Sequence, residues 1–177
     1  DRATYATLHT ASLASQHLAD GLTPDAAERA GRHLLSILGA HAVSLSDTGG
    51  VLSWTGVGEH HRGVAFNLGD ETRATGRTVV HGSTRITCDD DACPIRAAVT
   101  APLVMDDLVV GTLSAWTEQP SPGLAKATEE VAAWVSSQLA LAELARTRTR
   151  VMEAELRALR AQISPHFIYN SLAAIAS

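Results

Sequence analysis

The chain opens with small and apolar residues that recur at helical spacing. Leu8, Ala11, Ser15 and Leu18 fall on one stripe, and Gly21 interrupts it. The next stretch, "TPDAAERAGRHLLSILG", carries the strongest local signal in the first half of the chain. Its Thr can cap a helix, its Pro suits the first helical position, and its last Gly permits a left-handed stop. The sequence therefore predicts two helices before residue 40.

Alternating patterns follow and predict strands. "AVSLS" alternates, "DTGG" can turn, and "VLSW" returns, which together indicate a hairpin. "IRAAVTAPLVMDDLVVGTLSAW" predicts two more strands joined by a turn at Met105–Asp107. Between the two hairpins we expect a short helix at Asp70–Thr75, a short strand at Thr78–Val80 and otherwise a long loop. Long loops inside compact domains are often functional.

From Gly123 to Pro165 no strong helix breaker occurs, and the composition favours a single long helix. Near its end Met152, Leu156, Leu159 and Ile163 follow the 4-3-4 spacing of a coiled-coil seam. A helix of about 40 residues reaches roughly 60 Å, too far to fold back along a small domain. We therefore expect a parallel homodimer through this helix, with core packing in an antiparallel bundle as the alternative.

Composition narrows the class of protein. The chain has 177 residues and a net charge of −5, which gives no reason to expect direct binding of nucleic acid. Its two cysteines are too few for a disulfide scaffold, so a reducing compartment is expected. No apolar run is long enough to cross a bilayer. Because the first residue is Asp rather than Met, we expect the chain to be part of a longer protein whose preceding segment is attached to a membrane.

The loop-rich middle contains a possible ligand-binding or metal-binding group, His60, His61, Cys88 and Cys93. Sulfur and imidazole ligands suit zinc. The Cys-x4-Cys spacing is looser than in most zinc knuckles, so we favour no metal here and instead a loop of hydrogen-bonded histidines with two free thiols. The metal site and a disulfide or redox switch remain alternatives. Trp54 and Trp116 are expected to be core aromatics.

The order of elements predicts an α+β fold in which helices flank an antiparallel sheet. "AAVTAPLVMDDLVVGTLSAW" resembles the last two core strands of a GAF domain, with its "APL" strand, turn and "GTL" strand before a terminal helix. The resemblance covers roughly residues 23–141. It implies a GAF-like sheet that can enclose a small unknown ligand, followed by a long C-terminal signalling helix.

A second resemblance lies at the C-terminus. "AQISPHFIYNSL" resembles the phosphoacceptor motif of LytS-type sensor histidine kinases, Gln-x-x-Pro-His-Phe-x-(Phe/Tyr)-Asn-x-Leu. The resemblance implies that His166 accepts the γ-phosphoryl group of ATP. A neutral imidazole nitrogen is nucleophilic near neutral pH, which fits this role. Asn170, four residues on, can orient the ring, and Pro165 can kink the helix and turn His166 towards a kinase domain.

These resemblances give a domain plan. Residues 1–20 would form an N-terminal signalling helix, and residues 21–122 a GAF-like sensor domain whose closing helix runs on to about 141. Residues 123–163 would form a connecting dimer helix. Residues 164–177 would be the truncated start of the phosphoacceptor domain. In the family ATP is bound by a further C-terminal domain, which we expect to be missing from this chain, so that the fragment alone is inactive.

The family resemblance implies the cytoplasmic sensory and phosphoacceptor portion of a bacterial inner-membrane histidine kinase. Its partner would be a response regulator, expected to be of the LytTR type, that receives phosphate on an aspartate. Two other functions stay open. One is a stand-alone GAF regulator that binds a ligand and dimerises without kinase activity. The other is a GAF-type enzyme, such as a methionine sulfoxide reductase, that uses Cys88 or Cys93.

Overall fold

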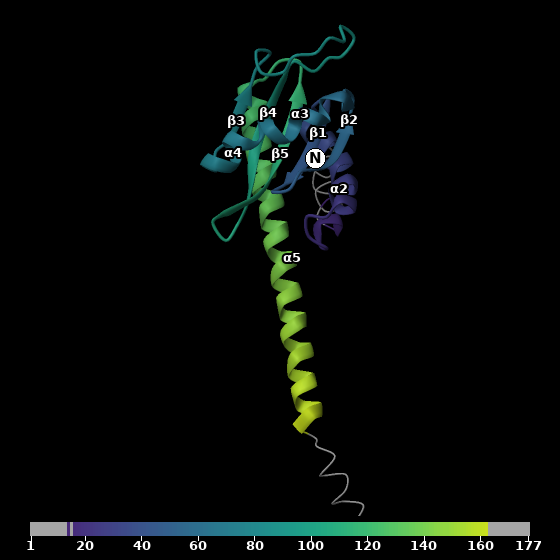
Figure 1. The fold of residues 1–177 in the computed structure, drawn as a ribbon, viewed down its shortest axis with the longest axis vertical. Coiled ribbons are helices and arrows are strands. Elements are labelled where there is room, and N and C mark those ends of the chain that lie inside the picture. The colour runs from purple at the N-terminus through teal and green to yellow at the C-terminus, as the bar shows by residue number, and fades with distance from the viewer. Residues whose placement is uncertain (1–13, 15, 163–177) are drawn as a thin grey trace, which may run out of the picture. The chain divides into compact units, whose positions relative to one another are not determined.

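The computed structural model describes residue 14 and residues 16–162, and it shows a five-stranded antiparallel sheet with helices on both faces (Figure 1). The expected α+β fold is confirmed. In chain order the elements are α2 (Pro24–Leu38), β1 (Ala42–Asp47), β2 (Val51–Gly56), the 3-10 helix η1 (Glu59–His61), α3 (Arg62–Leu68), α4 (Asp70–Thr75), β3 (Val79–His81), β4 (Ala97–Met105), β5 (Leu108–Thr117) and α5 (Pro122–Gln162).

The sheet has the strand order β2-β1-β5-β4-β3, and both predicted hairpins are present. In the first turn, a carboxylate oxygen of Asp47 accepts hydrogen bonds from the backbone N–H groups of Gly49 and Gly50. In the second, Asp106 and Asp107 both have positive φ angles, 49° and 62°. Two such residues form the turn that matches the twist of a tight hairpin. Strand β5 lies at the centre of the sheet, between β1 and β4.

Helix α2 begins and ends where its sequence predicts. The Thr23 hydroxyl accepts a hydrogen bond from the Ala26 N–H at 3.2 Å, and Pro24 occupies the first helical position. Gly39 ends the helix with φ 60°, and its N–H donates to the Leu35 carbonyl. A residue with a Cβ atom adopts that left-handed conformation only at a cost, which explains the glycine.

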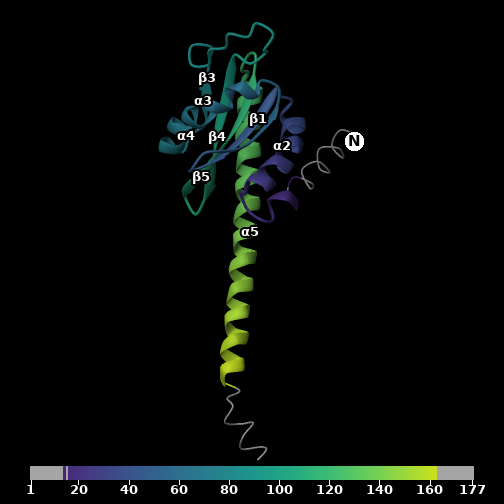
Figure 2. The ribbon, with the colours of Figure 1, turned by 45° about the vertical axis from the view of Figure 1, so that its right-hand side comes forward.

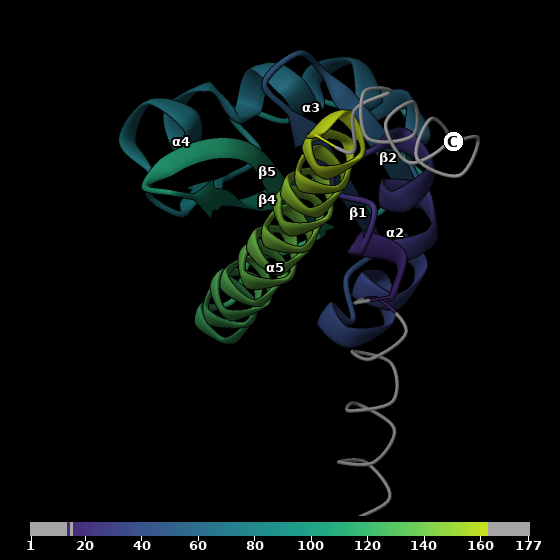
Figure 3. The same cartoon turned by 90° about the horizontal axis from the view of Figure 1, so that it is seen from below.

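One face of the sheet is covered by α2 and by the part of α5 up to Ala142, and Figure 3 shows α3 and α4 on the opposite side of β4 and β5. The first core lies under α2 and α5. It combines alternate residues of the central strands with the buried stripes of both helices, including Val43, Leu45, Leu113, Ala115, Ala30, Leu34, Val135 and Leu139.

The opposite face is covered by η1, α3, α4 and the segment between β3 and β4, and Figure 2 shows α3 and α4 on the side of the sheet away from α2. This second core holds Ala42, Trp54, Ala65, Leu68, Ile86, Cys93, Ile95, Ala98 and Trp116. The two tryptophans are therefore core residues, as expected. Helix α4 and strand β3 also form close to their expected positions.

Helix α3 and the turn η1 correct the sequence interpretation, which left residues 59–68 as loop. Helix α3 has only seven residues, no side-chain N-cap and an exposed Gly63 near its start. Such a short segment is not stable as an isolated helix, so its local signal is weak. It forms because Ala65 and Leu68 are buried against the sheet.

Helix α5 runs from Pro122 to Gln162 and belongs to two structural units that divide between Ala142 and Glu143. In the first unit its buried residues include Thr128, Ala132, Val135, Ser136 and Leu139. In the second unit no described side chain is buried, and those of Leu144, Met152, Leu156 and Leu159 are more than half exposed. Among the described helices, none combines the length and apolar character needed to span a membrane.

The domain plan stays a prediction at both ends of the chain. The proposed N-terminal helix, residues 1–20, lies mostly outside the described residues, although Leu18 is fully buried in the first core. The proposed phosphoacceptor segment, residues 164–177, lies wholly outside them.

A hydrogen bond to Ser136 links helix α5 to a bulge in strand β4. The pairing of β4 with β5 shifts register between Leu103 and Val104. There the Val104 N–H donates instead to the Ser136 hydroxyl at 2.9 Å, while that hydroxyl donates to the Ala132 carbonyl. The hydroxyl thus satisfies a backbone donor that the bulge releases from the strand pairing.

We predict that Ser136→Ala lowers the free energy of unfolding by about 1–3 kcal/mol, because it leaves a half-buried N–H without its acceptor. The matched control is Ser137→Ala. The Ser137 hydroxyl is exposed and bonds only to the Ala133 carbonyl within α5. Its removal should leave stability within about 0.5 kcal/mol. Urea denaturation measures both, and equal effects would show that the contact with Val104 contributes nothing.

Candidate metal-binding site

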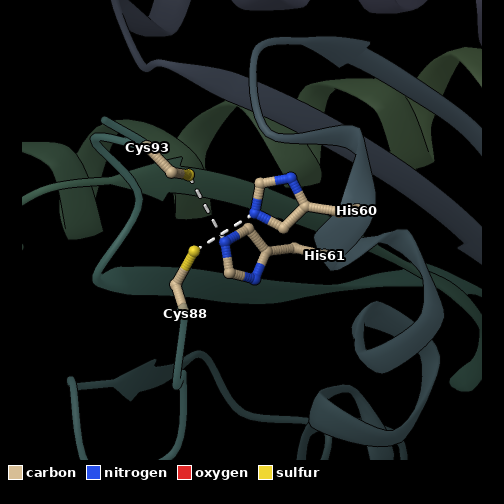
Figure 4. A group of neighbouring side chains, drawn as sticks. All are labelled: His60, His61, Cys88 and Cys93. Atoms are coloured by element: carbon tan, nitrogen blue, oxygen red, sulfur yellow. Dashed lines mark hydrogen bonds between the residues drawn. The ribbon is translucent and has the colours of Figure 1, made fainter. Parts of the chain in front are cut away.

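Two segments far apart in the sequence bring the four candidate ligands together (Figure 4). His60 and His61 lie on η1, directly after β2, while Cys88 and Cys93 lie in the segment between β3 and β4. All four ligand atoms lie within 4.8 Å of one another. The structure therefore joins residues that the sequence only suggested as a group.

Each thiol faces one imidazole. The Nε2 atom of His60 lies 3.2 Å from the Sγ atom of Cys88, and the Nε2 atom of His61 lies 3.5 Å from the Sγ atom of Cys93. The two imidazole rings are themselves adjacent, with centroids 4.4 Å apart. Both cysteines are free thiols.

The cluster has a buried half and an accessible half. His61 is 3% exposed and Cys93 is 5% exposed, whereas His60 is exposed and Cys88 is half-buried. Burial lowers the pKa of His61, and the nearby His60 and Arg96 lower it further. A lowered pKa favours the neutral imidazole, the form that can accept a hydrogen bond or bind a metal ion.

Asp90 shapes the loop that carries both cysteines. Its carboxylate accepts a hydrogen bond from the Ala92 N–H at 2.9 Å, and its carbonyl oxygen accepts one from the Cys93 N–H at 3.1 Å. Arg96 also donates to that carbonyl oxygen, at 3.3 Å, and to the Ile95 carbonyl. The loop from Cys88 to Cys93 is thus closed by hydrogen bonds before it reaches β4.

The buried half of the cluster rests on the aromatic core. The ring of His61 stacks on that of Trp116 on β5, with an interplanar angle of 21° and centroids 6.1 Å apart. Trp116 contacts Trp54 at 4.8 Å, and its Nε1–H donates to the Ser44 hydroxyl on β1 at 2.9 Å. The cluster is therefore anchored to the central strand β5 and, through Ser44, to its neighbour β1.

Gly58 permits the close approach of η1 to the cysteine loop. Its φ is 69°, in the left-handed region. A Cβ atom added there would lie 2.6 Å from Ile95 Cδ1, 3.3 Å from Cys93 Sγ and 3.4 Å from His61 Cδ2. The sequence analysis identified neither Gly58 nor the residues that shape the cysteine loop, Asp90 and Arg96.

Two surface hollows are described elsewhere in the domain, and the cysteines line neither. One, of about 500 Å³, is lined by α3, α4 and Arg85. The other, of about 350 Å³, lies between α2 and β2, with Trp54, Glu59 and Arg62 on its wall. The four candidate residues line neither of these two hollows, and their ligand atoms lie close to one another instead.

The predicted phosphoacceptor residues, Pro165, His166 and Asn170, lie outside the described residues. Gln162, the first residue of the motif, is the last residue of α5. Their roles in phosphate transfer therefore stay predictions.

A family model described as Histidine kinase matches residues 154–177, which include the whole motif. The chain is 30% identical to the Sensor protein LytS of Bacillus anthracis over 96% of its own length. It is 30% identical to the Sensor histidine kinase/phosphatase LytS of Staphylococcus aureus over 89%. Over nearly its whole length the chain is similar to part of the LytS sensor histidine kinases. It spans about 30% of the length of these LytS proteins, 30% and 28% in the two cases.

Solved structures similar to this chain confirm the GAF-like fold. A GAF domain from A. aeolicus has a TM-score of 0.54 at 12% identity, with 78% of this chain and 98% of that one covered. The free methionine-R-sulfoxide reductase of Neisseria meningitidis, solved with its substrate, has a TM-score of 0.55 at 22% identity, with 82% and 94% covered. At these identities the similarity shows the fold alone.

We predict that Gly58→Ala lowers the free energy of unfolding by about 1–3 kcal/mol, through the strained backbone and the overlap with Ile95. The matched control is Gly63→Ala in α3, where a Cβ atom would meet nothing within 4 Å. That change should be neutral or should stabilise by up to about 1 kcal/mol. Thermal unfolding of both variants tests the difference. Equal stability would contradict the close packing at Gly58.

Proposed function

We propose that this chain is the sensory and phosphoacceptor portion of a two-component sensor histidine kinase, and that the complete protein phosphorylates His166. The observation that carries the proposal is the location of the motif. His166 lies inside the segment matched by the histidine kinase family model, and the whole region is similar to LytS sensor proteins. The kinase activity and the ATP it requires belong to the complete protein.

The chemistry assigned to His166 is nucleophilic. A neutral imidazole nitrogen attacks the γ-phosphorus of ATP, a P–N bond forms, the bond to the bridging oxygen breaks and ADP leaves. The ring then carries the phosphoryl group until an aspartate of a response regulator accepts it. We assign Asn170 to orienting the ring, because it lies four residues on, and residues at that spacing share one face of a helix. Pro165 would bend the helix just before the nucleophile.

The domain plan is part of this proposal. The GAF-like domain receives a signal, and α5 carries it towards the phosphoacceptor. The first unit supports this plan because α5 begins as part of the core of the domain, through Ala132, Val135 and Leu139. A membrane-attached segment before residue 1 and a LytTR-type response regulator are the partners that the family resemblance suggests.

Dimerisation is proposed to use the apolar stripe of α5. Met152, Leu156 and Leu159 are 55%, 52% and 56% exposed, although they carry the spacing of a coiled-coil seam. Exposed apolar residues at that spacing are covered when a second copy pairs along the same face. The sensor kinase family also assembles as dimers.

We expect His166→Gln to abolish phosphorylation of the complete protein, purified with its membrane segment in detergent or nanodiscs. Wild-type protein with γ-labelled ATP should acquire phosphate that is labile to acid and stable to base. The matched control is His33→Gln, a substitution of the half-buried histidine on α2 that stacks on His17. It should label as the wild type does. Undiminished label on His166→Gln would refute the assigned site.

The same assay separates the other two functions. A stand-alone GAF regulator predicts that no label appears on the complete protein under any condition. A methionine sulfoxide reductase predicts thiol-dependent reduction of free methionine sulfoxide that Cys93→Ser abolishes and His166→Gln leaves intact.

We also predict that Leu156→Glu shifts the 177-residue chain from dimer to monomer, because it places a charge in the proposed seam. Ala158→Glu is the matched control. Ala158 is exposed on the same turn, and it lies outside the 4-3-4 spacing. Sedimentation velocity at several concentrations gives the mass of each. If both variants remain dimeric, the seam is not where the chains meet.

A further inference from the structure

We propose that His60, His61, Cys88 and Cys93 form a tetrahedral zinc site in the GAF-like domain. The proposal is independent of phosphate transfer, because none of the four residues lies in the phosphoacceptor motif. It goes beyond the sequence interpretation, in which the spacing of the cysteines counted against a metal.

The separations among the ligand atoms fit a tetrahedral ion. With Zn–N bonds of about 2.0–2.1 Å and Zn–S bonds of about 2.3 Å, ligand atoms lie roughly 3.3–3.8 Å from one another. The two imidazole–thiol pairs lie at 3.2 and 3.5 Å, and no pair among the four exceeds 4.8 Å. Shifts of about an ångström would therefore bring all four atoms around one centre.

The donor set also selects the ion. Two cysteine sulfurs and two imidazole nitrogens are the ligands of Cys2His2 structural zinc sites, and four protein ligands leave no open position for a substrate. Oxygen-preferring ions such as Mg²⁺ and Ca²⁺ do not suit this set. Binding Zn²⁺ would release one proton from each thiol, so the site would hold one dication and two thiolates with no net charge.

The local structure holds the two cysteines in place without help from a helix or strand of their own. The cysteines lie 28 and 32 residues from their histidine partners, in a segment with no strand or helix between β3 and β4. Asp90 closes the cysteine loop, and Gly58 allows η1 to approach it. A thiol–imidazole hydrogen bond is weak, so an ion shared by both segments would supply much stronger cross-linking.

Such a site would stabilise the fold, and its occupancy by zinc would change with the concentration of available metal or with oxidation of the cysteines. Its inner ligands, His61 and Cys93, are buried against Trp116, while His60 and Cys88 face solvent. The accessible half can gain or lose the ion while the inner half remains packed. Loss of the ion would free the cysteine loop that leads through Arg96 into β4.

The test uses the 177-residue chain, released from any histidine tag and purified in a reducing buffer. Elemental analysis should find one zinc per chain. Co²⁺ added to the metal-free protein should give the thiolate charge-transfer absorption and the intense visible bands of a tetrahedral site. The chain without metal should bind Zn²⁺ stoichiometrically in competition with a chromophoric chelator.

The informative variants change the two accessible ligands, His60 and Cys88, because replacing a solvent-exposed or half-buried side chain disturbs the fold least. Cys88→Ser and His60→Ala should each weaken Zn²⁺ binding by at least about 100-fold, since loss of even an outer-shell partner costs 10–100-fold. The control His33→Ala should bind as the wild type does, and far-UV circular dichroism should show all three folded.

Two results would overturn the proposal. Zinc that is unaffected by Cys88→Ser and His60→Ala, without thiolate absorption from Co²⁺, would be an adventitious ion only. A reduced protein that binds no zinc, yet loses two hydrogens in mass on mild oxidation, would show that the cysteines form a disulfide switch instead.

Discussion

Strand β5 is buried along most of its length on both faces of the sheet, and the rest of the domain follows from that constraint. From Gly111 to Thr117 each of its residues is buried. A strand in this position needs a separate cover for each face, because its alternate residues point to opposite sides. Helices α2 and α5 supply one cover, and η1, α3, α4 and the cysteine loop supply the other. The candidate metal site is therefore part of the second cover.

Local signals in the sequence were sufficient wherever an element stabilises itself. Thr23 and Gly39 bound α2, and the "DTGG" and Asp106–Asp107 turns define two hairpins, because caps and turns depend on neighbouring residues. Helix α3 was missed because it depends on burial of Ala65 and Leu68 rather than on its own seven residues. The resemblance to a GAF domain predicted an antiparallel sheet flanked by helices, but it did not predict the short elements η1 and α3.

The candidate site shows the same limit more strongly. His60, His61, Cys88 and Cys93 were recognised by residue type, but the wide Cys-x4-Cys spacing argued against a shared centre. What brings them together is the closing of the loop by Asp90 and the absence of a Cβ atom at Gly58. Neither feature has a period or a motif in the sequence. For the proposed phosphoacceptor the situation is reversed, because its motif is explicit in the sequence and all of it after Gln162 lies outside the described residues.

The two covers meet at adjacent residues of β5, which gives a physical route from the cluster to α5. Trp116 faces His61 in the second core, and Ala115 faces the first core with Val135 and Leu139. Because neighbouring strand residues are one backbone unit apart, a shift of Trp116 cannot leave Ala115 unmoved in a close-packed interior.

A second link lies at the other end of β4, where Ser136 of α5 binds the bulge at Val104. Arg96, which contacts the cysteine loop, directly precedes that strand. Strands β4 and β5 therefore each connect the His-Cys cluster to the part of α5 that packs on the sheet, at Val135, Ser136 and Leu139. A change at the proposed metal site would reach α5 through these strands.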